Sequence, residues 1–131
     1  MEFAHNQLPG SLELAYLGDS IYELYVREAL IRRGGRVKEL HKRAVSCVNA
    51  AAQARALSKI EDGLSEDELA VVRRARNARQ TPTKGADIAD YHKATALEAL
   101  IGYWHVTGNK ARIDRVLIPL IEEALGDDAR K

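Results

Sequence analysis

The sequence contains little that could cross-link or interrupt the chain. Its single cysteine, Cys47, excludes an intrachain disulfide and a four-cysteine zinc site. Only three prolines occur in 131 residues, and no apolar run approaches the length that crosses a bilayer. The first residues lack the basic and then apolar order of a signal peptide. We therefore expect a cytoplasmic protein, because free thiols suit a reducing compartment.

The composition is that of an ordinary folded domain. Hydrophobic residues make up 46% and charged residues 30% of the chain, which excludes a disordered or collagen-like polymer. A chain of this length favours one domain and can bury enough surface to fold without disulfides or a structural metal ion. We predict a single domain over residues 1–131, with its core at about residues 11–125.

Patterning favours helices throughout, because apolar residues recur at helical spacing and no stretch alternates with period two. We predict an all-α fold with helices over residues 11–33, 37–60, 65–79, 87–106 and 109–125, a loop over 80–86, and a break left open in the second helix. Ser11 is the expected N-cap of the first helix, and Ser65 with Glu68 forms a capping box. The first helix is apolar on several sides, which predicts a largely buried position. Pro119 should kink or split the last helix.

Charge is balanced overall but uneven along the chain. The formal net charge is +1, yet no acid occurs over residues 69–86. That stretch contains Arg73, Arg74, Arg76, Arg79 and Lys84 around Asn77. A near-neutral chain can thus present a basic face that suits a polyanion. The plain alternative is a solvated helix surface.

Two acids interrupt otherwise apolar helical stretches. Asp19 and Glu98 each stand in the middle of a predicted helix among apolar neighbours. Neither has a cation three or four residues away, whereas Glu23 has Arg27 four residues on and should pair with it. Because charged groups are seldom buried alone, each acid should be protonated, meet an arginine from elsewhere, or bind a cation. One divalent metal ion would serve both acids.

Glycines beside these acids predict where their helices meet. Gly18 precedes Asp19, and Gly102 lies one turn after Glu98 on the same face. A glycine within a helix costs about 1 kcal/mol relative to alanine, so two of them favour a close approach of helices. We predict that the helices cross here and bring the two acids together. Carboxylates suit Mg²⁺, with Mn²⁺ as a substitute, and the four histidines lack zinc-ligand spacing.

At these residues the chain resembles the ribonuclease III family. Residues 14–23 (LAYLGDSIYE) resemble its signature helix, and residues 97–102 (LEALIG) resemble its second acidic motif. The likeness covers roughly residues 12–121 and is greatest to Mini-III, a ribonuclease III catalytic domain without a double-stranded RNA-binding domain. The run over residues 73–79 (RRARNAR) is also similar to that subgroup.

The resemblance implies a compact helical ribonuclease III domain that acts as a homodimer. It implies a Mg²⁺-dependent endoribonuclease that cuts double-stranded RNA to 5′-phosphate ends and matures the precursor of large-subunit (23S) ribosomal RNA. By position, Asp19 and Glu98 are its two central catalytic and metal-binding acids. The family's further acids fall at positions that here hold Leu12, Ala15, Gln53 and Thr95. With fewer acids, the site could hold one or two metal ions, and the sequence does not decide between them. It also leaves open whether a ribosomal protein assists the reaction.

Other questions also stay open at this point. A catalytically inactive RNA-binding scaffold in ribosome assembly would keep the fold but should lack one of the two acids. A helical protein-interaction module would leave the unpaired acids unexplained. The dimer interface is not identified, and Tyr16, Tyr22 and Tyr25 are candidates for it or for plain core packing. Contacts to RNA phosphates and 2′-hydroxyls are expected from Arg73, Arg74, Arg76, Asn77, Arg79 and Lys84.

Overall fold

A computed structural model describes residues 7–78 and 87–126, and over these ranges the chain is helical. In chain order the elements are α1 (Ser11–Arg33), α2 (Val37–Cys47), α3 (Ala50–Ile60), the short 3-10 helix η2 (Glu61–Gly63), α4 (Glu66–Arg76), α5 (Ile88–Val106) and α6 (Lys110–Leu125). No strand occurs in the described ranges, so the predicted all-α class is confirmed. None of the described helices is long and apolar enough to cross a membrane.

Local capping explains where the helices begin. The hydroxyl of Ser65 accepts from the backbone N–H of Glu68, and the Glu68 carboxylate accepts from the N–H of Ser65, which is the predicted capping box of α4. The bounds of α1 are as predicted, but its N-cap is Gly10 rather than Ser11. The Gly10 N–H donates to Glu13 at 3.1 Å, so the first-turn acid replaces a capping side chain.

The structure decides the details of two predicted helices. The break left open over residues 37–60 is present, and these residues form α2 and α3, because the side chain of Asn49 accepts from Ala52 N–H and caps a new helix. Of the two alternatives predicted for Pro119, a kink or a split, the split is wrong, since α6 continues through Pro119. Proline has no backbone N–H, so the carbonyl of Arg115 lacks its helical hydrogen-bond partner at residue 119. Arg115 and Pro119 are both exposed, so water can donate a hydrogen bond to that carbonyl. The predicted loop over residues 80–86 lies outside the described residues.

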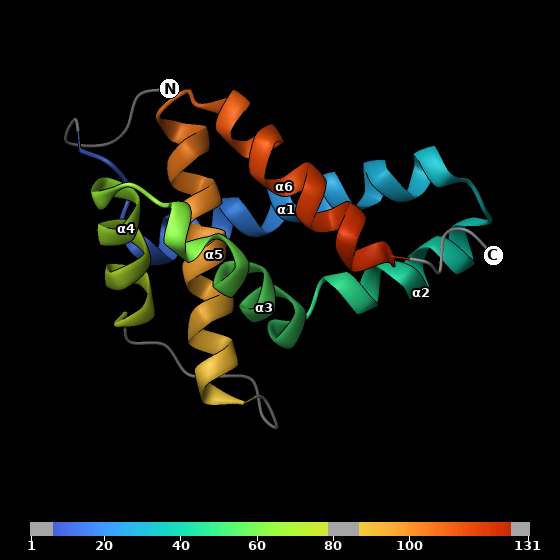
Figure 1. The fold of residues 1–131 in the computed structure, drawn as a ribbon, viewed down its shortest axis with the longest axis horizontal. Coiled ribbons are helices and arrows are strands. Elements are labelled where there is room, and N and C mark those ends of the chain that lie inside the picture. The colour runs from blue at the N-terminus through green and yellow to red at the C-terminus, as the bar shows by residue number, and fades with distance from the viewer. Residues whose placement is uncertain (1–6, 79–86, 127–131) are drawn as a thin grey trace.

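Helix α5 is the centre of the fold. It contacts α1, α3, α4 and α6, and Figure 1 shows it crossing α1 with α4 on one side and α3 and α6 on the other. Its core-facing side chains are fully buried and include Leu97, Leu100, Ile101 and Trp104. The expectation that the first helix is largely buried was wrong, because Leu12, Tyr16, Leu24 and Ile31 on α1 are exposed.

The crossing of α1 and α5 depends on two glycines. A Cβ atom at Gly18 would lie 1.7 Å from the carbonyl oxygen of Glu98, and a Cβ atom at Gly102 would lie 2.1 Å from that of Leu14. Neither backbone can accept a side chain at those distances, because packed interiors have no spare volume. The predicted meeting of the two helices at these residues is therefore confirmed.

A buried polar network fixes α4 against α5 and α6. Glu68 accepts from the indole N–H of Trp104 at 2.6 Å and from Arg112 Nε at 3.0 Å. Although burial opposes it, these bonds and the capping bond from Ser65 lower the pKa of Glu68 to about 2. The guanidinium of Arg112 also lies 5.4 Å from the centre of the Trp104 ring. This network holds the helix that carries the predicted basic cluster in a fixed position.

Substituting Gly18→Ala should destabilise the protein strongly, because the new methyl group would overlap the Glu98 backbone. Overpacking of this kind costs about 3 kcal/mol, which lowers the melting temperature by roughly 10 °C in a domain of this size. Gly63→Ala is the matched control, since nothing lies within 4 Å of a Cβ atom there. Thermal unfolding followed by circular dichroism measures both. Equal melting temperatures for Gly18→Ala and the wild type would contradict the proposed close crossing.

Candidate active site

The two acids singled out in the sequence lie on either side of the helix crossing. Asp19 follows Gly18 on α1, and Glu98 is the α5 residue whose carbonyl contacts Gly18. Both side chains line one pocket of about 550 Å³, and their carboxyl groups lie within hydrogen-bonding reach of each other. The structure thus brings together two acids that are separated by most of the chain.

Three parts of the fold supply the walls of this pocket, named here the acidic pocket. They are the first half of α1, the α2–α3 junction with the start of α3, and the first half of α5. The lining residues are Leu12, Ala15, Tyr16, Asp19, Val48, Asn49, Ala50, Gln53, Tyr91, Ala94, Thr95 and Glu98. The walls mix apolar and polar side chains, and the two acids are the only described lining residues with a carboxyl group; no described lysine, arginine or histidine lines the pocket.

Burial and mutual repulsion change the chemistry of Glu98. Its side chain is half-buried, and burial raises its pKa, as do the hydrogen bond and the negative charge of Asp19. The nearby amide of Gln53 has the opposite effect but is outweighed, so the pKa of Glu98 reaches about 8. The meeting of the two carboxyl groups therefore favours the protonated form of Glu98.

The expected burial of both acids was wrong for Asp19. Its side chain is exposed at the rim of the acidic pocket, although its neighbours in the sequence are apolar. The alternative that each acid meets an arginine is also excluded among the described residues, where neither acid forms an ion pair. Glu23 does pair with Arg27 at 2.8 Å, as predicted.

The positions at which this chain lacks the further acids of the family lie together in the structure. The four positions where the resemblance expects further acids all line the acidic pocket, and they hold Leu12, Ala15, Gln53 and Thr95. In the described ranges no three histidine, cysteine, aspartate or glutamate side chains come together. The pocket therefore offers two carboxylates and several neutral groups to a ligand.

Sequence reasoning missed the polar role of Gln53. Its side chain is only 5% exposed, and its amide nitrogen has no hydrogen-bond partner of normal geometry among the described residues. The signal was present in the sequence, because Gln53 is the one polar residue in the run of small side chains over residues 50–54. A polar residue in such a run faces either solvent or a site, and here it faces the site.

The predicted basic cluster lies at the C-terminal end of α4. Arg73, Arg74, Arg76 and Asn77 are exposed, and Arg79 and Lys84 lie outside the described residues. Arg73, Arg74 and Asn77 line a hollow of about 560 Å³ together with Ser11. Since Ser11 precedes Leu12 of the acidic pocket, the first turn of α1 separates the two hollows.

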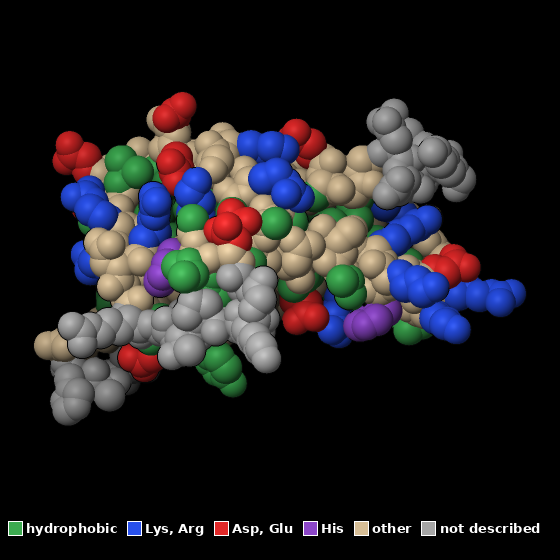
Figure 2. Space-filling model, turned by 90° about the horizontal axis from the view of Figure 1, so that it is seen from below, with side chains coloured by type: hydrophobic (Ala, Val, Ile, Leu, Met, Phe, Trp, Pro, Cys, Tyr) green, Lys and Arg blue, Asp and Glu red, His purple; other side chains and the backbone are tan. Residues whose placement is uncertain are grey.

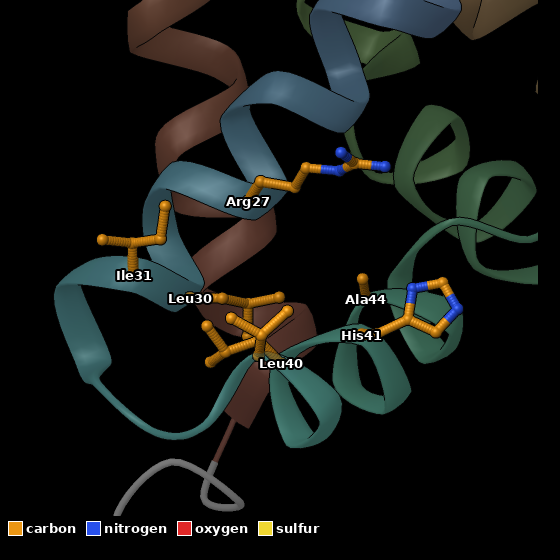
Figure 3. Close-up of a pocket in the computed structure, with 7 residues that line it drawn as sticks. Arg27, Leu30, Ile31, Leu40, His41 and Ala44 are labelled. Atoms are coloured by element: carbon orange, nitrogen blue, oxygen red, sulfur yellow. The ribbon is translucent and has the colours of Figure 1, made fainter.

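A further hollow of about 240 Å³ lies between α1 and α2 and has different chemistry. Figure 3 shows its apolar floor, with Leu30, Leu40 and Ala44 beneath and Arg27 and His41 at the edge. No acid lines it, so it cannot supply a carboxylate site. Figure 2 shows Lys and Arg side chains near both ends of the face seen from below, over the α2 end and over the α4 end.

Comparisons with known proteins point to the same family as the sequence motifs. A family model described as the ribonuclease III domain matches residues 12–109. The chain is 47% identical to the Mini-ribonuclease 3 of Desulfitobacterium hafniense over 79% of this chain and 66% of that protein. It is also 47% identical to the Mini-ribonuclease 3 of Symbiobacterium thermophilum, over 81% of this chain and 83% of that protein.

The fold has a solved counterpart. An X-ray crystal structure of a protein from Fusobacterium nucleatum superposes with a TM-score of 0.81 at 32% sequence identity, covering 87% of this chain and 93% of that one. The family model and the relatives thus confirm the expectation of an endoribonuclease that acts on double-stranded RNA, in a family that depends on divalent metal ions. The chain belongs to the ribonuclease III family, in its Mini-ribonuclease 3 branch.

Proposed function

We propose that RNA is cleaved in the acidic pocket, with Asp19 and Glu98 as the catalytic and metal-binding acids. The observation that carries this proposal is a pair of carboxyl groups that share one open pocket and have no cationic partner among the described residues. The likeness of residues 14–23 and 97–102 to the two ribonuclease III motifs supports the same assignment.

The donor set fits a hard divalent ion. The lining residues include two carboxylates and no histidine or cysteine, and oxygen ligands suit Mg²⁺, with Mn²⁺ as a substitute. Magnesium keeps several waters in protein sites, so two protein carboxylates are a sufficient anchor. Such an ion, when bound, supplies charge neutralisation at the scissile phosphate and activation of a water molecule.

The residues of the chain have distinct parts in this reaction. Asp19, exposed at the open rim, and Glu98 would together hold the ion, and Glu98 would bind it as a carboxylate, with its proton passing to solvent. The hydroxyl of Ser20 donates to the carbonyl of Leu17 at 2.7 Å, so a water rather than this side chain is the nucleophile. The water attacks phosphorus in line and the bond to the 3′ oxygen breaks, which leaves a 5′-phosphate and a 3′-hydroxyl.

The duplex is held by the basic cluster on α4. Arg73, Arg74, Arg76 and Asn77 are exposed and form no ion pair within the described residues, which leaves their donors available for phosphates. The hollow beside Ser11 adjoins the acidic pocket across one turn of α1, so a single strand can contact both. Arg79 and Lys84 continue the same sequence run and belong to the proposed surface.

A homodimer would place two acidic pockets across one duplex, since a two-fold axis matches the two antiparallel strands. Tyr16 is 85% exposed and lines the acidic pocket, which makes it the best candidate among the three tyrosines for that interface. Tyr22 is buried in the core. We further infer that residues 1–131 form one catalytic domain that matures a ribosomal RNA precursor. The mass measured by sedimentation tests the homodimer, and mapping of the RNA ends tests the substrate.

The variants Asp19→Asn and Glu98→Gln should fold normally and lose Mg²⁺-dependent cleavage of double-stranded RNA. Loss of several kcal/mol of transition-state stabilisation corresponds to a kcat that is about 1000-fold lower. Gel-based cleavage of a structured ribosomal RNA precursor, with Mg²⁺ or with chelator, measures the effect. Cleavage at the wild-type rate by either variant would remove the site assignment. Wild-type protein that binds RNA but never cleaves it would favour the inactive scaffold.

In chelator, the stability of the wild type should fall as the pH rises from about 5 to 8. The pKa of Glu98 is about 8 in the folded protein against an ordinary 4.5, so in this window the folded state binds more protons than the unfolded state. Glu98→Gln carries no titrating carboxyl and should lose less stability over the same range. Melting temperatures at four pH values measure the difference. Parallel curves for the two proteins would show that Glu98 is not protonated in this way.

The double variant Arg73→Gln/Arg74→Gln should bind double-stranded RNA more weakly, with a salt dependence that is shallower by about two counterions. Arg115→Gln is the matched control, because Arg115 is exposed on α6 and lines neither hollow. Gel-shift titrations at several salt concentrations measure both. If the double variant matched the control in affinity and in salt slope, the α4 arginines would be solvated surface only.

A further inference from the structure

Gln53 is a buried polar group on the wall of the acidic pocket. It lies on α3 between Ala52 and Ala54, which are also buried, and its side chain is 5% exposed. Its amide nitrogen has no hydrogen-bond partner of normal geometry among the described residues. A buried amide donor without a partner lowers the stability of a folded protein, so its presence calls for a compensating role.

The position of this amide points to one neighbour. Gln53 lines the acidic pocket together with Asp19 and Glu98, and its side chain is close enough to interact with the carboxyl group of Glu98. An amide nitrogen only donates, and an ionised carboxylate only accepts. The small side chains beside Gln53 let α3 lie close to α5, which leaves the amide as the group from α3 that reaches into this part of the pocket.

We propose that Gln53 is a positioning residue whose amide N–H donates to one oxygen of the Glu98 carboxylate and turns the other oxygen toward the divalent ion. This inference rests on the proposed function. A neutral donor suits the place better than a third carboxylate, because it orients Glu98 without adding negative charge. Partners of this kind outside the ligand shell typically change metal affinity by 10-fold to 100-fold.

A purely structural role of Gln53 predicts the opposite effects on stability and on metal binding. If Gln53 only filled space or supported the core, Gln53→Leu would change stability and leave metal binding intact. If Gln53 positions Glu98, Gln53→Leu removes a buried donor that forms no hydrogen bond of normal geometry and keeps the approximate volume, so the metal-free protein should melt at the same temperature or higher. Its affinity for Mn²⁺ should be weaker by about 10-fold or more.

The test is a Mn²⁺ titration of the full chain without RNA, followed by electron paramagnetic resonance of the free ion. Wild type, Gln53→Leu, Ser58→Ala and Asp19→Asn are compared, with melting temperatures in chelator for each. Ser58 is exposed on the same helix and does not line the acidic pocket, so Ser58→Ala should behave as wild type. If Gln53→Leu does not fold, Gln53→Met, which keeps the unbranched shape, takes its place.

The outcomes separate this inference from the proposed function. Weaker Mn²⁺ binding by Gln53→Leu without loss of stability supports the positioning role, and the kcat of RNA cleavage should fall while the KM for RNA stays constant. Wild-type Mn²⁺ affinity in Gln53→Leu overturns the positioning role, even if Asp19→Asn has lost binding. Wild-type Mn²⁺ affinity in Asp19→Asn means that the proposed metal site itself is wrong.

Discussion

The close crossing of α1 and α5 is the constraint on which the rest of the structure depends. At Gly18 and Gly102 the two backbones approach so closely that no side chain fits between them. Asp19 and Glu98 flank this contact, so the same backbone approach that builds the core also sets the separation of the two carboxyl groups. Precision at the site thus comes from main-chain packing, which varies less than the placement of long side chains on a surface.

The acidic pocket brings together two acids whose negative charges repel each other. Two carboxyl groups meet where burial already raises the pKa of Glu98, and a buried amide beside them lacks a partner of normal geometry. Functional sites commonly break the rules that the rest of a fold obeys. The buried acid Glu68, by contrast, is satisfied by hydrogen bonds from Arg112 and Trp104. The contrast supports the proposal that the chemistry takes place in the acidic pocket.

Sequence patterns predicted much of this arrangement. The positions of Gly18 and Gly102 beside two unpaired acids identified the crossing, because glycine and charge are both unfavourable in the middle of an apolar helix. The exposure of Asp19 could not be predicted, since it depends on the pocket that α3 and α5 build around it. The break at Asn49 and the continuity of α6 through Pro119 depend on local hydrogen bonds and solvent exposure, which periodicity does not report.

The central claim is that one divalent ion is held between Asp19 and Glu98. Anomalous diffraction from a crystal of the wild-type protein soaked in Mn²⁺ tests this most directly, because it locates the ion without reference to activity. We expect an anomalous peak in the acidic pocket, within about 2–2.5 Å of an oxygen of each carboxylate or one water further away. A peak held by other side chains, or a pocket that stays empty at saturating Mn²⁺ while Asp19 and Glu98 remain hydrogen-bonded, would contradict the claim.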